Sequence, residues 1–208
     1  PYLLPRGADD PFADSDYEGY VVTHLDRVLP LVGRRYTRVY PYFWSKVRDD
    51  GADHRRVREL YDAKVAYTDH HVGRLLDHLD SLALADSTLV VVTSDHGEGL
   101  FQHGIREHEE VPYEHQIHVP LLIRGPGIAP ATLAEAPVDL VDLPGALARI
   151  AGARDPDLTA PGNGQLLAAL GLDESSGGTD GSVVTEVYVA DRGEHLQSAL
   201  DDDQKLIR

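Results

Sequence analysis

The sequence predicts an α/β fold with a mostly parallel central sheet, helices on the faces of that sheet, and a small antiparallel sheet at the C-terminus. Three observations lead to this prediction: a long segment with helical periodicity, two short apolar runs without alternation, and a pair of strand-like segments at the C-terminal end. With 208 residues and 42% hydrophobic composition, the chain is long enough to bury a core.

The helical segment covers about residues 53–82. Apolar or small side chains recur there every three or four residues, namely Val57, Tyr61, Val65, Thr68, Val72, Leu75 and Leu79. Charged side chains fill the opposite face, namely Arg55, Arg58, Lys64, Asp69, Arg74 and Asp77. We therefore expect one long amphipathic helix whose apolar face meets the core.

The apolar runs are "STLVVVTSD", residues 87–95, and "HVPLLIRGPG", residues 118–127. An apolar run without alternation is typical of a strand that is covered on both faces, as in a parallel sheet. The segment "PVDLVDLPGALARIAG", residues 137–152, then predicts a second helix. Its regular part should begin near Pro144, and Gly152 should lie near its C-cap.

The remaining segments predict loops and the small sheet. Residues 1–16 are rich in Pro, Gly and Asp and indicate an irregular loop, and "ESSGGTDG" within residues 153–181 indicates a flexible linker. Beyond it, "SVVTEVYV" and "LQSALDDDQKLIR" predict strands joined by the turn "ADRGE". We expect an α/β portion over residues 1–172 and a linker with a small antiparallel subdomain over residues 173–208.

The charge of the chain restricts its partners. The 35 acidic and 19 basic residues give a formal charge of −16, which repels nucleic acid and anionic membranes, so a polyanion-binding role is disfavoured. Dense acidic charge also suggests a hypothesis of a high-salt source, in which cations screen the self-repulsion; the alternative is an ordinary acidic protein. No apolar stretch approaches the ~20 residues of a membrane span, and no signal peptide is recognised, so we expect a soluble chain of unassigned compartment.

Two absences concern the chain itself. It contains no Cys, so thiolate ligands, disulfides and a cysteine nucleophile are ruled out within it. It also contains no Met and begins with Pro1 and Tyr2, so we expect it to be a piece of a longer protein.

Asp95 and His96 follow the first apolar run directly, in "VVVTSDHGEG". Ligands of open α/β sheets bind at the carboxyl ends of strands, and a carboxylate beside an imidazole suits a divalent cation. The alternative is a turn in which Asp95 caps a helix and His96 is surface. The histidines downstream favour a site, namely His103, His108, His115 and His118, with Glu107, Glu109, Glu110 and Glu114 among them.

Three stretches in this order carry a resemblance: "YDAKVAYTDHHVGRLLDHLD", "STLVVVTSDHGEGLFQHG" and "YEHQIHVPLLIRGPG". Together they resemble the second half of the sulfatase family of the alkaline phosphatase superfamily. The segments around residues 137–152 and 182–208 are similar to the next helix and the C-terminal sheet of that family, so the resemblance covers about residues 54–208. It implies an alkaline-phosphatase-like sandwich fold.

The resemblance also implies roles for particular residues. Asp95 and His96 match two metal ligands, for Ca²⁺ first and Mg²⁺ or Mn²⁺ as alternatives, and Asp95 would lie close enough to the nucleophile to help deprotonate it. A Lys or His about a dozen residues later contacts the sulfate and its leaving oxygen; His108 is our candidate and His103 its rival. A protonated imidazole there would serve as the acid, while His115 and His118 are left as structural or surface residues.

Sulfatases attack with a formylglycine that is made within a C/S-x-P-x-R motif, and this chain contains no such motif. The resemblance therefore implies hydrolysis of a small-molecule or carbohydrate sulfate ester by a protein whose nucleophile and other metal carboxylates lie outside these residues. We expect the 208-residue chain alone to be inactive and to hold a cation weakly.

Two alternatives remain open at this point. One is a phosphodiesterase or phosphonate monoester hydrolase of the same superfamily, which shares the metal site. The other is a non-catalytic binding or assembly protein that has kept the fold. The presence of the nucleophile motif upstream would separate the enzymes from the pseudoenzyme, while the particular ester and the oligomeric state stay open.

Overall fold

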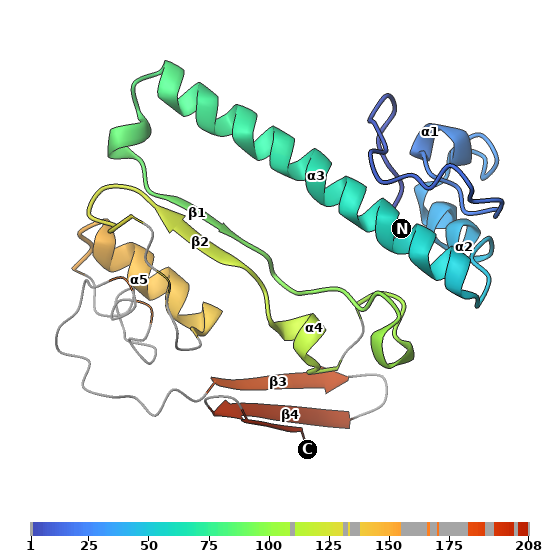
Figure 1. Cartoon of the computed structure of the whole chain (residues 1–208). Helices are drawn as coiled ribbons and strands as arrows, with labels where there is room; N and C mark the ends of the chain where they lie inside the picture. Colours follow the sequence, from blue (N-terminus) through green and yellow to red (C-terminus); the bar gives the residue numbers. More distant parts are fainter. Residues whose placement is uncertain are drawn as a thin grey trace. The chain divides into compact units, whose positions relative to one another are not determined.

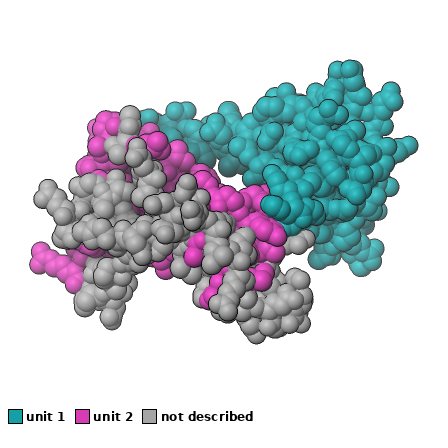
Figure 2. Space-filling model, turned by 60° about the horizontal axis from the view of Figure 1, so that its bottom comes forward, with its two compact units in different colours: residues 1–85, 99–107 teal, residues 86–98, 108–208 magenta. Residues whose placement is uncertain are grey.

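The computed structural model describes residues 2–108, 111–130, 133, 138–154, 166, 170, 183–189, 194–201 and 204–207. The chain divides into two compact units, residues 1–85 with 99–107 (unit 1) and residues 86–98 with 108–208 (unit 2) (Figure 2). The described helices are α1 (Leu25–Val28), η1 (Tyr36–Arg38), α2 (Val39–Trp44), α3 (Gly51–Ser81), η2 (Ala85–Ser87), η3 (Gln102–Gly104), α4 (Glu114–Ile117), η4 (Leu140–Asp142) and α5 (Leu143–Ile150). The strands are β1 (Val90–Thr93), β2 (Leu121–Arg124), β3 (Val183–Val189), β4 (Glu194–Asp201) and β5 (Gln204–Ile207) (Figure 1).

Unit 1 is built around the first turns of α3. The helix begins where Asp50 accepts hydrogen bonds from the backbone amides of Ala52 and Asp53, which satisfies two of the free donors of the first turn. The core of the unit consists of apolar side chains from the N-terminal loop, α1, α2 and α3, namely Tyr2, Leu3, Leu4, Val21, Val28, Val32, Val39, Phe43, Val47, Val57, Leu60 and Ala63. The N-terminal loop is thus irregular, as predicted, but it supplies core residues that its composition did not indicate.

The predicted helix over residues 53–82 is confirmed as α3, and the side chains of its predicted charged face are exposed except for Lys64, which is half-buried. The predicted apolar face is correct only near the start of the helix. Val57 is buried, whereas Val65 and Leu75 are exposed. The reason is local: the core of unit 1 covers only the first turns, where Leu60 and Ala63 are buried as well.

A buried carboxylate fixes the start of α3. The side chain of Asp53 is fully buried and accepts hydrogen bonds from the Tyr17 hydroxyl (2.7 Å) and from the Arg48 amide (2.7 Å), Nε (3.0 Å) and Nη2 (2.8 Å). The bonds from Arg48, the largest cause, outweigh the burial and hold the pKa of Asp53 well below its usual range. This arrangement joins two loops to the first turn of the helix.

Unit 2 contains both sheets. Strands β1 and β2 pair antiparallel, with Val90 opposite Arg124 and Thr93 opposite Leu121 (Figure 1). The predicted mostly parallel sheet is therefore not confirmed; the one parallel pairing among the described residues is an isolated bridge between Leu4 and His24. An apolar run without alternation indicates that both faces of a strand are covered, but it carries no information about the direction of the neighbouring strand.

The second predicted helix is confirmed as η4 followed by α5, with Pro144 in the first turn. Gly152 has a φ of 80° just beyond the helix, a conformation that glycine adopts at little cost. Ala146 of α5 and Leu166 form a buried cluster, and Leu121 and Ile123 of β2 pack against this cluster, which places the helix on the β1–β2 sheet.

The predicted C-terminal antiparallel sheet is confirmed, with three strands in the order β3–β4–β5. It has one strand more than the predicted hairpin, because "LQSALDDDQKLIR" contains both β4 and β5. The predicted linker and the boundary at residue 172 lie outside the described residues. Among the described helices, none combines the length and the apolar character needed to cross a bilayer.

Candidate active site

The turn that follows β1 is held by the backbone of α4. The Gly97 amide donates a hydrogen bond of 2.6 Å to the carbonyl of Gln116, and the Ser94 hydroxyl donates one of 2.8 Å to the carbonyl of His96. A Cβ at position 97 would lie 2.0 Å from the carbonyl oxygen of His115. Position 97 therefore requires glycine for a close backbone approach rather than for an unusual φ.

The imidazole of His96 is oriented by this turn. Its Nδ1 lies 2.8 Å from the carbonyl oxygen of Gly97, which can only accept, so Nδ1 carries the proton. The lone pair of the neutral ring is then on Nε2, the nitrogen 3.8 Å from Oδ2 of Asp95. A backbone carbonyl that fixes the tautomer in this way is a common partner of a metal-binding histidine.

Asp95 is ionised and accessible. Its side chain is 87% exposed, and Oδ1 accepts a hydrogen bond of 3.0 Å from the His96 amide. A hydrogen bond from its own backbone amide, followed by the nearby His96, lowers the pKa of Asp95 below its ordinary value. Oδ2 accepts no hydrogen bond from any residue that the structure describes, so this oxygen remains able to bind a ligand.

The two open atoms fit one divalent cation. Ligand atoms that bind the same ion at ~2.1–2.4 Å are roughly 3–4.5 Å apart, a range that includes the separation between Asp95 and His96. Within the described parts of the chain, no group of three or more His, Asp or Glu side chains is arranged to hold a metal ion. The pair would thus supply part of a coordination sphere.

The structure brings His108 to the same place. Its ring lies against the ring of His96, with 4.2 Å between centroids and 34° between planes. Its Nδ1 is 3.6 Å from Oε1 of Glu98, a buried oxygen that has no hydrogen-bond partner among the described residues. Asp95, His96, Glu98 and His108 therefore gather within unit 2.

Sequence reasoning missed Glu98. A glutamate between two glycines is typical of a solvated turn, so the histidines downstream were selected as site candidates and Glu98 was not. The available signal was its position: it lies two residues after His96 in the same turn, where side chains no longer alternate as in a strand.

His103, the rival of His108, belongs to unit 1 and lies in η3, where it is exposed and has a φ of 53°. Its loop, residues 99–107, is held by unit 1: the ring of Phe101 stacks on His54 at 3.7 Å, and Trp44 Nε1 donates a hydrogen bond of 2.5 Å to Glu107. His103 and His108 are therefore in different units.

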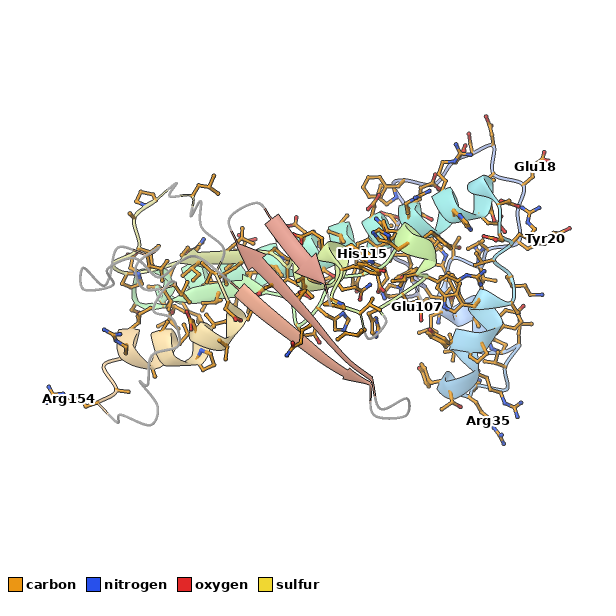
Figure 3. The ribbon with its side chains drawn as sticks, turned by 90° about the horizontal axis from the view of Figure 1, so that it is seen from below. Glu18, Tyr20, Arg35, Glu107, His115 and Arg154 are labelled. Atoms are coloured by element: carbon orange, nitrogen blue, oxygen red, sulfur yellow. The ribbon has the colours of Figure 1, made fainter. Side chains whose placement is uncertain are left out.

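The other two histidines are both near α4. His118 is exposed and pairs with Glu114 at 2.9 Å, and the half-buried His115 stacks on Tyr113 at 5.8 Å. Figure 3 labels His115. The structural or surface role expected of these two histidines stays a prediction. Two of the glutamates in the predicted acidic and histidine-rich loop, Glu109 and Glu110, lie outside the described residues.

The fold of the chain is that of solved sulfatases. A 2-O GAG sulfatase matches with a TM-score of 0.61 at 22% identity, over 78% of this chain and 35% of that chain. A structure from Bacteroides fragilis matches with a TM-score of 0.62 at 20% identity, over 78% of this chain and 38% of that one. These neighbours place the chain among proteins of the alkaline-phosphatase-like fold.

The chain belongs to the sulfatase family, because the family model described as sulfatase matches residues 20–153. It is 40% identical to the choline-sulfatase of Rhizobium meliloti over 98 residues, which are 47% of this chain and 19% of that protein. It is 46% identical to the human iduronate 2-sulfatase over 85 residues, 39% of this chain and 14% of that protein. The matched region thus spans less than a fifth of either relative.

Proposed function

We propose that the chain is part of a metal-dependent sulfuric ester hydrolase whose formylglycine nucleophile is contributed by residues outside these 208. One observation carries this proposal: Asp95 and His96 present open ligand atoms after β1, and the ring of His108 lies against His96 in the same unit. Membership of the sulfatase family supports the reaction class.

Asp95 and His96 would hold a divalent cation, with Ca²⁺ first and Mg²⁺ or Mn²⁺ as alternatives. The bound ion would supply a positive charge that stabilises the oxygens of the ester and of the nucleophile. The hydrogen bond from His96 Nδ1 to Gly97 keeps Nε2 available for it, and the ionised Asp95 carboxylate needs no proton release before binding.

His108 would contact the sulfate and give a proton to the departing oxygen. Glu98 would position this ring, because its buried Oε1 faces Nδ1 of His108 and leaves Nε2 to reach the ester. We prefer His108 to His103 for this role because His108 lies against a proposed metal ligand, whereas His103 belongs to the loop held by unit 1.

We propose a small-molecule or carbohydrate sulfate ester as the substrate. The names of two relatives, choline-sulfatase and iduronate 2-sulfatase, cover both kinds of substrate and support no choice between them. We propose no nucleic acid or membrane partner, in agreement with the formal charge of −16.

The test uses the protein that carries this chain together with its upstream nucleophile motif, assayed with a chromogenic aryl sulfate. Asp95→Asn and His96→Gln should each lower both the bound metal, measured by atomic emission, and kcat, the latter by about 10²-fold or more. His108→Gln should lower kcat by about 10²–10⁴-fold and leave the metal content unchanged. His118→Gln is the matched control, since it changes an exposed histidine on α4.

Full activity of Asp95→Asn would contradict the proposal, as would equal losses in His108→Gln and His118→Gln. Faster turnover of a chromogenic phosphodiester than of the aryl sulfate would move the assignment to a phosphodiesterase. The 208-residue chain alone should turn over neither ester.

A further inference from the structure

Residues 27–48, here named the basic segment, differ in charge from the rest of the chain. The segment contains six basic residues and no Asp or Glu, in a protein with 35 acidic and 19 basic residues. The six are Arg27, Arg34, Arg35, Arg38, Lys46 and Arg48. The negative net charge is therefore an average that conceals one positive region.

The fold of unit 1 fixes the backbone of the basic segment. Val28, Val32, Val39 and Phe43 are buried in the core of the unit. Between them, the Arg34 amide donates a hydrogen bond of 2.7 Å to the carbonyl of Leu29, which closes a turn. The buried residues face inward at intervals, so the intervening cationic side chains face solvent.

Four arginines of the segment have no anionic partner among the residues that the structure describes. Arg27, Arg34, Arg35 and Arg38 are exposed, and none of them forms an ion pair with any residue that the structure describes. The buried Arg56 of the same unit, by contrast, is paired with both Asp10 and Glu59. Figure 3 shows the side chain of Arg35 pointing outward from the unit.

Large apolar and aromatic side chains are exposed in the same segment. Tyr36 is 68% exposed, Leu31 64% and Tyr40 45%. Tyr36 and Tyr40 are four residues apart on consecutive helical turns, so they lie on the same exposed face. Val39 and Phe43 have the same spacing and are buried. Tyrosine and arginine together are enriched at binding surfaces, where rigid rings supply contact area and guanidinium groups bind anions in pairs of hydrogen bonds.

We infer that the basic segment, through Arg34, Arg35, Arg38, Tyr36 and Tyr40, is a non-catalytic binding surface for a sulfated polysaccharide. The inference rests on the proposed function, since a polymer that carries sulfate esters would be repelled by an acidic protein unless a local positive surface held it. Sulfate groups match the guanidinium fork, and the apolar faces of sugar rings match exposed tyrosine rings. A duplex nucleic acid or a membrane presents a broader anionic surface, which would also meet the acidic residues outside the segment.

The experiment measures the affinity of the full 208-residue chain for fluorescently labelled heparin by anisotropy, between 50 and 300 mM KCl. The triple variant Arg34→Gln, Arg35→Gln, Arg38→Gln should bind about ten-fold more weakly or worse at low salt, and its slope of log K on log salt should fall by about two to three. The matched control replaces three exposed arginines of α3, Arg55, Arg58 and Arg74, by Gln and should bind within about two-fold of the unaltered chain.

Two further variants separate charge and ring contacts from folding. Replacement of the same three arginines of the basic segment by Lys should retain most of the salt slope, and Tyr36→Ser should weaken binding without changing that slope. Thermal unfolding of all variants is monitored by circular dichroism. A variant that binds more weakly but unfolds at the same midpoint temperature has lost contacts of the binding surface and not its fold.

Equal loss in the control triple would overturn the inference, as would unchanged binding by the Arg34, Arg35 and Arg38 variant. Equal affinity for desulfated heparin, duplex DNA or phosphatidylserine vesicles would overturn the assignment to a sulfated polysaccharide. Because the assay measures binding without turnover, failure of the proposed hydrolysis would appear separately, in the aryl sulfate assay.

Discussion

Asp53 in unit 1 and Asp95 in unit 2 are two ionised carboxylates with opposite surroundings. Asp53 is fully buried, and both of its oxygens are occupied by hydrogen bonds from Tyr17 and Arg48. Asp95 is exposed and keeps Oδ2 open beside an imidazole nitrogen. Both pKa values lie below the ordinary range, so a lowered pKa alone does not distinguish a structural carboxylate from a functional one; the unoccupied oxygen does.

The largest effect on stability should come from Asp53→Asn. An amide would direct two donors at the donors of Arg48 and Tyr17, so we expect a loss of about 2–4 kcal/mol in the free energy of unfolding. Asp95→Asn should change it by less than about 0.5 kcal/mol, because the side chain is exposed. Urea unfolding of both variants measures the difference, and comparable losses would remove the distinction between the two sites.

Gly97→Ala tests the turn that supports Asp95. The added Cβ would lie 2.0 Å from the carbonyl oxygen of His115, so the backbone must move, at a cost of about 1–3 kcal/mol. Gly73→Ala is the control, since no atom lies within 4 Å of its Cβ position; in the middle of α3 it should stabilise by up to about 1 kcal/mol. Unchanged stability of Gly97→Ala, by the same urea measurement, would mean that the close approach is relieved cheaply.

Tyr17→Phe tests the Asp53 side and should cost about 1 kcal/mol, since the carboxylate loses one of its donors. It should also change the dependence on pH. Burial, followed by the hydrogen bond to Asp53, raises the pKa of Tyr17 to about 12. A raised pKa gives stability that is complete below the unfolded value near 10 and is lost as the pH rises towards 12.

Unfolding midpoints of the unaltered chain and of Tyr17→Phe, measured between pH 8 and 12, give this contribution. The difference between them should shrink as the pH rises through this interval. A difference that stays constant would show that the hydroxyl titrates with an ordinary pKa.

The smallest effect should come from salt, which acts on exposed carboxylates such as Asp95 and spares buried ones such as Asp53. If the charge of −16 reflects a high-salt source, the thermal midpoint should rise by a few degrees as KCl is increased. A midpoint that stays constant or falls with added KCl would contradict the hypothesis of a high-salt source and favour an ordinary acidic protein.

The sequence allowed the elements to be predicted better than their partners. The periodicity after Asp53 located α3 to within two residues at each end, because helix formation depends on local spacing and on the cap at Asp50. The direction of β1 relative to β2 depends on partners 28 to 34 residues away, and the pairing of Asp53 with Tyr17 spans 36 residues. Composition and periodicity describe neighbours in the sequence, so they do not predict contacts between residues that are far apart in it.

The candidate site shows the same division. Asp95 and His96 could be selected because they follow a buried strand, and His108 because it matches a family position. Glu98 was missed, since its position in the turn is a weak signal and its significance depends on a buried oxygen 3.6 Å from Nδ1 of His108. The basic segment was missed as well, because the net charge of the whole chain is negative and does not show where the positive charges lie.

The loop of residues 99–107 interrupts unit 2 in sequence while its contacts belong to unit 1. No single cut in the gene therefore yields either unit alone. The hydrogen bond of 3.0 Å from the Gly99 amide to the Glu107 carbonyl closes the base of this loop, so a two-residue turn could replace residues 100–106. Expressing unit 2 alone therefore requires two changes, removal of residues 1–85 and replacement of the loop, because the loop packs on aromatic side chains of unit 1 that would then be missing.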